Sequence, residues 1–340
     1  MKVTNLSVLA PGAESRHPGS GRRVAIGTFD GLHVGHREVI RGNDTVLTFD
    51  PHPMSVIRPE ATPKLVMPFA IKRDLIAGLG VEELVVISFD TSFAALSAEH
   101  FIADVLLDRL GATAISVGEN FRFGHGAGGT PESLSARSEF ATRVVALVEV
   151  AGEAVSSSQI RGLVAAGEVD KAATFLGAPF MLEGEVVHGD RRGRELGMPT
   201  ANVVPEDRLV APGHGVYAGW AHVKPLPAQP AEPAASDPLP AQPAEPAASG
   251  FPAAINVGVR PTFETGRGLL VEPHLIGFDG DLYGQTLRIA FLERMRGERR
   301  FESAEALMEQ MSEDVAQAQA ICERSRQPPP SDRRSPRSCC

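Results

Sequence analysis

The sequence changes its character near Gly177, and this change constrains the fold more than any other feature. Before that residue, short runs of β-branched and other apolar residues alternate with segments whose apolar residues recur at helical spacing. After it, short apolar runs are separated by Gly and Pro, with no helical pattern between them. The first pattern is typical of a parallel sheet covered by helices, and the second of a small antiparallel barrel.

We therefore predict an α/β protein with two domains, for which 340 residues are sufficient. A Rossmann-like parallel-sheet domain (1–178) is followed by a barrel domain (179–324) that ends in an amphipathic helix capped by Ser303. The predicted sheet strands are 24–27, 45–49, 83–89, 114–117 and 143–147, with helices at 71–79 and 98–110. The predicted barrel strands are 180–188, 216–223, 253–257, 270–275 and 287–292, and the closing helix is 303–323.

Two segments lie outside this pattern. Residues 225–236 and 238–249 both read PLPAQPAEPAAS, a tandem duplication that has too few large apolar residues to form a core. We predict an extended loop inserted into the barrel domain, with a partner-binding arm as the alternative, because loops lengthen at little thermodynamic cost. The tail, 325–340, is rich in Arg, Ser and Pro and is predicted to be disordered.

Composition excludes several functional classes. The formal net charge is −9, which argues against general nucleic-acid binding, and no apolar run is long enough to span a bilayer. The first ten residues lack a convincing secretion signal, so we expect a cytoplasmic protein whose partners are small molecules. The cysteines, Cys322, Cys339 and Cys340, have no metal-binding spacing.

The segment 27–36 reads GTFDGLHVGH and connects the first predicted strand to a helix. His33 and His36 lie three residues apart at the helix start, where two imidazoles can bind phosphate oxygens and stabilise charge on a transferring group. Gly27, Asp30 and Gly35 belong to the same predicted ATP site. A metal-binding pair or two surface histidines are the alternatives.

Two further groups of residues fall near this turn in the predicted sheet. Ser157, Ser158 and Arg161 lie at the start of another helix, where the serines could cap it or join Arg161 in binding phosphates. Aromatic, amide and basic side chains follow two other strands, a composition that suits a planar, phosphate-bearing ligand. These residues are Phe49, Pro51, His52, Asn120 and Arg122.

The barrel half contains its own candidate site. A basic, glycine-rich stretch with Gly189, Gly193 and Gly197 could fold over phosphates. Thr200 and Asn202 follow it, and we expect their side-chain oxygens on one strand face, where they could bind Mg²⁺. An ordinary turn is the alternative for these two residues.

These motifs, in this order, resemble those of prokaryotic bifunctional riboflavin kinase/FAD synthetases. Residues 24–176 resemble the adenylyltransferase module, and residues 180–323 resemble the riboflavin kinase barrel. The resemblance implies an ATP- and Mg²⁺-dependent enzyme that converts riboflavin to FMN and FMN to FAD. It implies that His33, His36, Ser157, Ser158 and Arg161 bind ATP, and that Asn120 and residues 49–53 face the flavin. It also implies that Glu272 is the general base of the kinase.

The sequence departs from that family at several positions. Only the short stretch 37–44 joins the histidine turn to the second strand. Pro273 follows Glu272 and requires a strand edge or a bulge, and Gly277 occupies a position where relatives often have Asp. Two other functions are therefore considered: an FMN adenylyltransferase whose barrel only binds flavin, and a non-catalytic flavin sensor. The intact histidines, Thr200, Asn202 and Glu272 favour the bifunctional enzyme.

Overall fold

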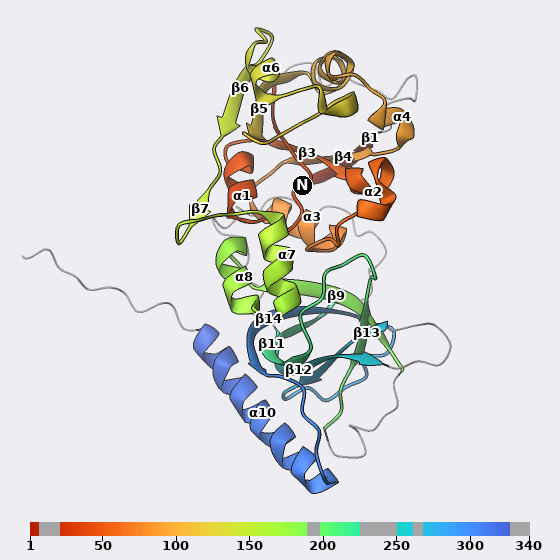
Figure 1. Ribbon diagram of the computed structural model, residues 1–340, viewed down its shortest axis with the longest axis vertical. Helices are drawn as coiled ribbons and strands as arrows, with labels where there is room; N and C mark the ends of the chain where they lie inside the picture. The colour runs from red at the N-terminus through yellow and green to blue at the C-terminus, as the bar shows by residue number, and fades with distance from the viewer. Residues whose placement is uncertain (7–20, 189–197, 225–249, 261–267, 327–340) are drawn as a thin grey trace, which may run out of the picture.

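The computed structural model describes residues 1–6, 21–188, 198–224, 250–260 and 268–326. Its N-terminal part contains a six-stranded sheet in the order β1-β4-β3-β2-β5-β6, in which every neighbouring pair is parallel (Figure 1). The strands are β1 (Lys2–Leu6), β2 (Arg22–Ile26), β3 (Thr45–Asp50), β4 (Glu83–Ser88), β5 (Ala112–Gly118) and β6 (Ala141–Val145).

The strand order creates a switch point beside β2. From β2 the chain moves outward to β3 and β4, and then returns to the other side of β2 to form β5 and β6. In open α/β sheets, ligands bind where the strand order reverses, outside the carboxyl ends of the strands. The loop that follows β2 therefore lies at the expected ligand-binding edge of the sheet.

Helices cover both faces of this sheet, and each face has its own core. Val24 and Ile26 pack with the π-helical segment η2, whereas Ala25, between them, packs with α1 and α3. Burial on both faces explains why the strands are continuous apolar runs. The helical elements are α1 (Val34–Ile40), α2 (Pro53–Ile57), η1 (Pro59–Ala61), α3 (Phe69–Gly78), α4 (Thr91–Ala94), α5 (Ala98–His100), η2 (Phe101–Arg109), η3 (His125–Ala127) and α6 (Pro131–Ser135).

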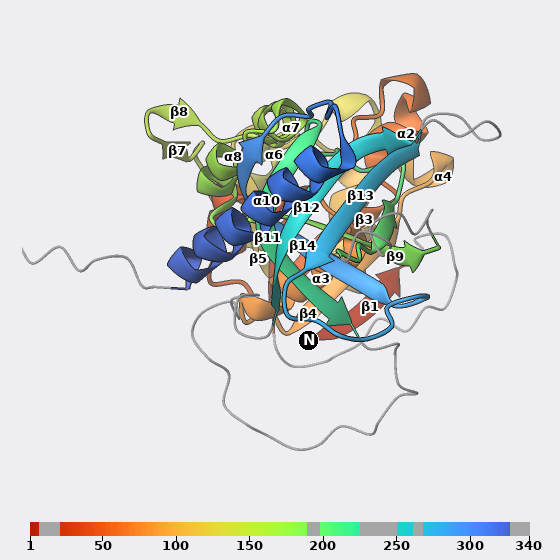
Figure 2. The ribbon, with the colours of Figure 1, turned by 90° about the horizontal axis from the view of Figure 1, so that it is seen from below.

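The C-terminal part is a closed antiparallel barrel in the order β10-β13-β12-β11-β14-β9. Its interior is filled by large side chains such as Tyr217, Ile255 and Phe291. The strands are β9 (Phe180–Val187), β10 (Asn202–Pro205), β11 (Gly215–Lys224), β12 (Phe251–Arg260), β13 (Gly268–Leu275) and β14 (Thr286–Arg296). Figure 2 shows α10 (Ala304–Ser325) lying across β11 and β12, where Ala318 and Ile321 pack.

Helices α7 (Ser157–Ala166) and α8 (Val169–Leu176) lie between the sheet and the barrel (Figure 1). Their buried residues, including Val164 and Phe175, share one hydrophobic core with the barrel interior. A small hairpin, β7 (Glu149–Val150) with β8 (Glu153–Ala154), precedes them. The two parts of the protein are thus joined by packed helices as well as by the chain itself.

The predicted fold class is confirmed, including the closing helix with Ser303 as its N-cap. The prediction missed β1 and β10, as well as the two-residue strands β7 and β8. β1 is a largely exposed edge strand, and β10 has only four residues, so neither has a strong apolar pattern. The duplicated segment, 225–249, and the tail from residue 327 lie outside the described residues. The domain boundary at 178/179 stays a prediction, and in its vicinity α8 ends at Leu176 and β9 begins at Phe180.

Candidate active sites

The two predicted histidines lie side by side at the start of α1. His33 is the N-cap of this helix, and its Nδ1 accepts a hydrogen bond from the backbone N–H of His36 at 3.2 Å. The imidazole rings stack with their centroids 3.5 Å apart, and the ring of Phe29 packs edge-on against His36 at 5.4 Å. The helix has only seven residues, in keeping with the short connection noted in the sequence.

Burial keeps both histidines neutral at pH 7. It lowers the pKa of His33, which is 7% exposed, to about 4. The pKa of His36 is lowered well below its ordinary value, first by burial and then by the charges of His33 and Lys72. Because Nδ1 of neutral His33 accepts a hydrogen bond, its proton is on Nε2, which can donate to a ligand oxygen. Nδ1 of His36 is buried and has no hydrogen-bond partner among the described residues.

The loop between β2 and α1 has a strained backbone. Phe29 and Leu32 have φ angles of 49° and 41°, a region that non-glycine residues rarely adopt, and both side chains are 1% exposed. A Cβ atom on Gly27 would lie 3.0 Å from the ring of Phe29, and one on Gly35 would lie 3.3 Å from the ring of His33. In this structure the two glycines therefore allow aromatic rings to pack closely against the loop.

Asp30 holds this loop against α7. Its Oδ1 accepts a hydrogen bond from the backbone N–H of Val66 at 2.8 Å, and its Oδ2 forms a 3.0 Å ion pair with Nη1 of Arg161. Its carbonyl oxygen accepts a hydrogen bond from the Ser157 hydroxyl at 2.8 Å. Burial raises the pKa of Asp30, while the Val66 N–H and the Arg161 charge act in the opposite direction. Both carboxylate oxygens are engaged, so Asp30 would influence a bound nucleotide through Arg161.

Three consecutive serines, Ser156, Ser157 and Ser158, make different contacts at the start of α7. Ser156 is the N-cap of α7, with its side chain accepting a hydrogen bond from the N–H of Gln159 at 3.2 Å. Ser158 accepts a hydrogen bond from Nη2 of Arg161 at 3.0 Å. Ser156 therefore caps the helix, whereas Ser157 contacts Asp30 and Ser158 contacts Arg161.

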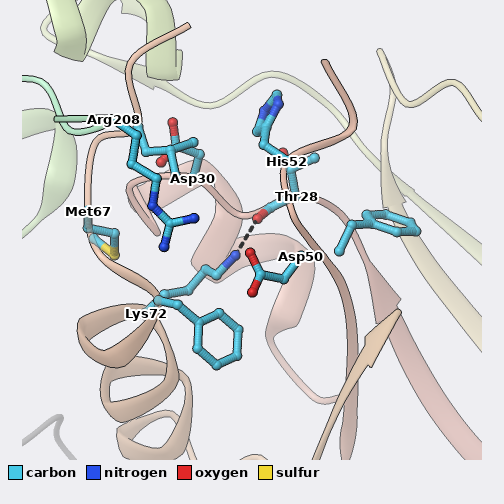
Figure 3. A pocket seen from close by; sticks show the side chains of 10 residues that line it. Thr28, Asp30, Asp50, His52, Met67, Lys72 and Arg208 are labelled. Carbon is cyan, nitrogen blue, oxygen red and sulfur yellow. Dashed lines mark hydrogen bonds between the residues drawn. The ribbon is translucent and has the colours of Figure 1, made fainter. Parts of the chain in front are cut away.

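A pocket opens at the carboxyl ends of β2 and β3 and includes a lysine that the sequence analysis missed. Lys72 of α3 directs its amine inward and donates hydrogen bonds to the Thr28 carbonyl oxygen at 3.2 Å and to Thr48 Oγ1 at 3.4 Å (Figure 3). Burial lowers the pKa of Lys72, opposed by the charges of Asp30 and Asp50. The pocket is lined by Thr28, Asp30, Phe49, Asp50, His52, Leu65, Met67, Phe69, Lys72 and Arg208.

The predicted flavin-binding residues separate into two groups. Phe49 and His52 line the pocket, with Pro51 in the same loop, and His52 also caps α2. Asn120 and Arg122 are exposed in the loop after β5 and do not line the pocket. Phe49 is only 8% exposed and also packs in the sheet core, so it serves both the core and the pocket wall.

In the barrel, polar residues form a row across β10, β13 and β12. Glu272 and Asn256 are cross-strand partners, and Nδ2 of Asn256 donates a hydrogen bond to Oε2 of Glu272 at 3.1 Å. Val203 pairs with Val271, so the same antiparallel register places Asn202 opposite Glu272. The two valines face the barrel core, and Asn202, Glu272 and Asn256 therefore lie on the outer face.

Pro273 occupies a position where its missing N–H is tolerated. Its carbonyl oxygen accepts a hydrogen bond from the N–H of Ala201 at 3.0 Å. Because the N and O of a strand residue point to the same side, the proline nitrogen faces Ala201, which lies just before β10 begins. This is a local strand edge of the kind the sequence analysis required. Gly277 has a φ of 77° in the turn after β13.

The rest of the predicted metal and phosphate site is only partly described. Thr200 lies two residues ahead of β10, outside the strand that contains Asn202. That the two side-chain oxygens share one face stays a prediction. Gly189, Gly193 and Gly197 lie outside the described residues. No cluster of three or more His, Cys, Asp or Glu suited to a metal occurs in the described ranges. A hydroxyl and an amide oxygen beside a carboxylate nevertheless fit Mg²⁺, which prefers hard oxygen donors and keeps several waters.

The fold and the two polar sites define a two-domain transferase that handles phosphorylated ligands in each half. Comparison with known families agrees: residues 16–159 match the FAD synthetase family, and residues 176–322 match the riboflavin kinase family. The chain belongs to the bifunctional riboflavin kinase/FMN adenylyltransferase family and has both of its domains. This favours the bifunctional enzyme over a single-activity protein or a flavin sensor.

Similar proteins span nearly the whole chain. The bifunctional riboflavin kinase/FMN adenylyltransferase of Pseudomonas fluorescens is 33% identical, with 88% of this chain and 92% of that protein covered. The protein of the same name from Bacillus subtilis is also 33% identical, with 87% and 90% covered. A crystal structure from Streptococcus pneumoniae, described as a macrolide-efflux protein, has a TM-score of 0.76 at 28% identity and covers 94% of this chain and 99% of its own. No helix within the described ranges is long and apolar enough to cross a bilayer.

Proposed function

We propose that this enzyme makes FAD from riboflavin in two ATP-dependent steps, one in each domain. In the barrel, the 5′-hydroxyl oxygen of riboflavin attacks the γ-phosphorus of ATP, giving FMN and ADP. In the sheet domain, a phosphate oxygen of FMN attacks the α-phosphorus of another ATP, giving FAD and pyrophosphate. The observation that carries the proposal is that each domain holds its own polar centre, around His33 and Arg161 in one and around Glu272 in the other.

In adenylyl transfer, the protein's task is to position two phosphates and to stabilise charge on the departing pyrophosphate. Neutral His33 and His36 donate N–H groups to phosphate oxygens of ATP, which is consistent with their lowered pKa values. Arg161, which Asp30 and Ser158 hold in place, supplies a fixed positive charge to the same phosphates.

The flavin of FMN is proposed to lie on the side of the β3 loop. Phe49 and His52 line the pocket there and offer flat surfaces, with Pro51 between Asp50 and His52. Asn120 and Arg122, exposed at the end of β5, are proposed to contact the outer part of the ring system. This arrangement would leave the FMN phosphate near Lys72 at the inner end of the pocket.

In the kinase reaction, Glu272 is proposed to accept the proton of the riboflavin 5′-hydroxyl as its oxygen attacks phosphorus. The hydrogen bond from Asn256 fixes the orientation of this carboxylate. Thr200 and Asn202 would hold Mg²⁺, which neutralises charge on the ATP phosphates. Gly189, Gly193 and Gly197 are proposed to let the backbone approach those phosphates closely.

The proposal is tested by giving the purified protein riboflavin or FMN with Mg·ATP and separating the flavins by chromatography. We expect FMN and then FAD from riboflavin, and FAD from supplied FMN. FAD from FMN without any conversion of riboflavin would support the single-activity enzyme. Binding of flavin without any product would support the sensor.

We also propose a cytoplasmic location for this enzyme. Cell fractionation tests this directly. Recovery of the protein with a cytoplasmic marker is the expected result, and its recovery with membranes or in the culture medium would contradict it.

A further inference from the structure

A segment of the barrel domain docks against the adenylyl-transfer pocket. A few residues after the end of β10, Leu209 forms a short parallel bridge with Leu65 of the sheet domain, and Arg208 precedes it in the chain. The Leu65 N–H donates to the carbonyl oxygen of Arg208 at 2.7 Å, and the Val210 N–H donates to the carbonyl oxygen of Leu65 at 2.8 Å. These backbone hydrogen bonds fix the position of Arg208 relative to the other domain without using its side chain.

A second contact between the domains fixes the helix that carries Lys72. Nη2 of Arg288, on β14, forms a 2.8 Å ion pair with Oδ2 of Asp74 on α3 and a 2.7 Å ion pair with Glu183 on β9. Asp74 lies two residues after Lys72. These two contacts between the domains therefore fix the position of Lys72 relative to Arg208.

The two basic side chains converge in the pocket. Figure 3 shows the guanidinium of Arg208 and the amine of Lys72 directed into the same space, with Asp30 and Asp50 nearby. Glu206 accepts a hydrogen bond from Nε of Arg208, which orients the terminal nitrogens of the guanidinium. The Arg208 side chain is 48% exposed, so a ligand can reach it.

Two basic side chains that face one pocket can bind an anionic ligand together. Burial lowers the pKa of Lys72, the charges of Asp30 and Asp50 raise it, and the charge of Arg208 lowers it, as expected when two positive groups lie close together. An anion bound between them would relieve this repulsion. A phosphate monoester suits the position best because its several oxygens can accept bonds from both an ammonium and a planar guanidinium.

We infer that Arg208 of the barrel domain, together with Lys72, binds the phosphate of FMN in the adenylylation site. The inference rests on the proposed function. Arg208 lines the pocket together with Phe49 and His52, the residues proposed to face the flavin, whereas Arg161 is not among the lining residues and pairs with Asp30 and Ser158. The barrel domain thus supplies a specificity-determining residue to the other domain's reaction, distinguishing FMN from unphosphorylated flavin.

The test compares steady-state kinetics of FMN adenylylation in Arg208→Gln, Arg208→Lys and Lys64→Gln. Arg208→Gln should raise KM for FMN by ~10-fold or more, the effect of losing a charge-assisted contact, while KM for ATP and riboflavin phosphorylation stay near the parent values. Arg208→Lys should recover part of the loss. Lys64→Gln removes a positive charge from the same domain contact, where Lys64 bonds to the Asp207 carbonyl outside the pocket, and should leave KM for FMN unchanged.

Several outcomes would overturn the inference. They are an unchanged KM for FMN in Arg208→Gln, a rise in KM for ATP instead, or an equal rise in Lys64→Gln. Thermal unfolding of each variant shows whether the domain contact is intact, and Arg208→Lys provides a second test if Arg208→Gln is destabilised. A parent protein that makes no FAD from FMN would overturn the proposed function as well, so the two failures are distinguishable.

Discussion

Nη1 of Arg161 lies 3.0 Å from Oδ2 of Asp30, and this ion pair joins residues that are 131 positions apart in the sequence. It connects the loop after β2, which contains both histidines, to the start of α7. The side chains of Asp30 and Arg161 are 6% and 19% exposed, so solvent screens the pair only weakly. The two groups of residues predicted to bind ATP are therefore held together by a buried contact.

The ion pair leads to the first prediction. Asp30→Asn keeps an acceptor for the Val66 N–H but removes the charge that orients Arg161, so KM for ATP in adenylylation should rise on the order of tenfold. Riboflavin phosphorylation should stay at the parent rate. Glu38→Gln, which removes a carboxylate from more exposed ion pairs in the same domain, is the matched control. An unchanged KM for ATP in Asp30→Asn would show that Arg161 does not need this partner.

The histidine pair leads to the prediction that FAD formation can be lost while riboflavin phosphorylation is kept. His36→Ala should stop FAD formation while FMN still accumulates from riboflavin, because loss of one such phosphate donor costs ~100-fold or more. The measurement is the flavin product distribution over time, with folding checked by circular dichroism. Equal loss of both activities in a folded variant would refute the model of two separate sites.

Much of this site follows from the sequence, and the rest depends on tertiary contacts. The histidines, Ser158 and Arg161 were predictable because each follows a recognisable strand end or begins a helix. Lys72 and Arg208 could not be predicted, because a single basic residue in a helix or a loop gives no sequence signal for a site. Only the fold directs both side chains into one pocket. The alignment of Asn202, Glu272 and Asn256 on the outer face could be inferred only from the strand register, which apolar patterns alone do not define.

The lowered pKa of His33 predicts a dependence of stability on pH. The unfolded chain binds a proton at this residue near pH 6.5, whereas the folded protein binds it near pH 4. Between these values the unfolded state holds more protons, so the free energy of unfolding falls as the pH is lowered from about 6.5 to about 4. The contribution of His33 is on the order of 3 kcal/mol, and other buried histidines add to it.

Thermal unfolding of the parent and of His33→Asn at several pH values tests this. Asparagine is a good N-cap, so the variant should fold, but its melting temperature should fall less steeply between pH 6.5 and 4. The difference should reach a few degrees, at ~1–2 °C for each kcal/mol in a chain of 340 residues. Parallel curves for the two proteins would mean that His33 titrates normally in the folded state.

The duplicated segment leads to a prediction about the loop between β11 and β12. These strands pair up to Ala221 and Phe251, so they can be joined by a short turn. Replacing residues 225–249 with a short Gly/Asn turn should leave both activities and the melting temperature nearly unchanged, since the composition of the segment does not support a core. A drop of more than ~10 °C, beyond what about 1–2 kcal/mol would produce, would mean that the segment packs or acts.

The proposal that each domain catalyses one of the two reactions is tested most directly by the Glu272→Gln variant, assayed with riboflavin and, separately, with FMN. The change keeps the shape of the side chain and its place beside Asn256 but removes the base. We expect riboflavin to bind while its phosphorylation slows ~100-fold or more, with supplied FMN converted to FAD at the parent rate. Phosphorylation of riboflavin at the parent rate would mean that Glu272 is only a strand residue, and would contradict the proposed mechanism of the kinase domain.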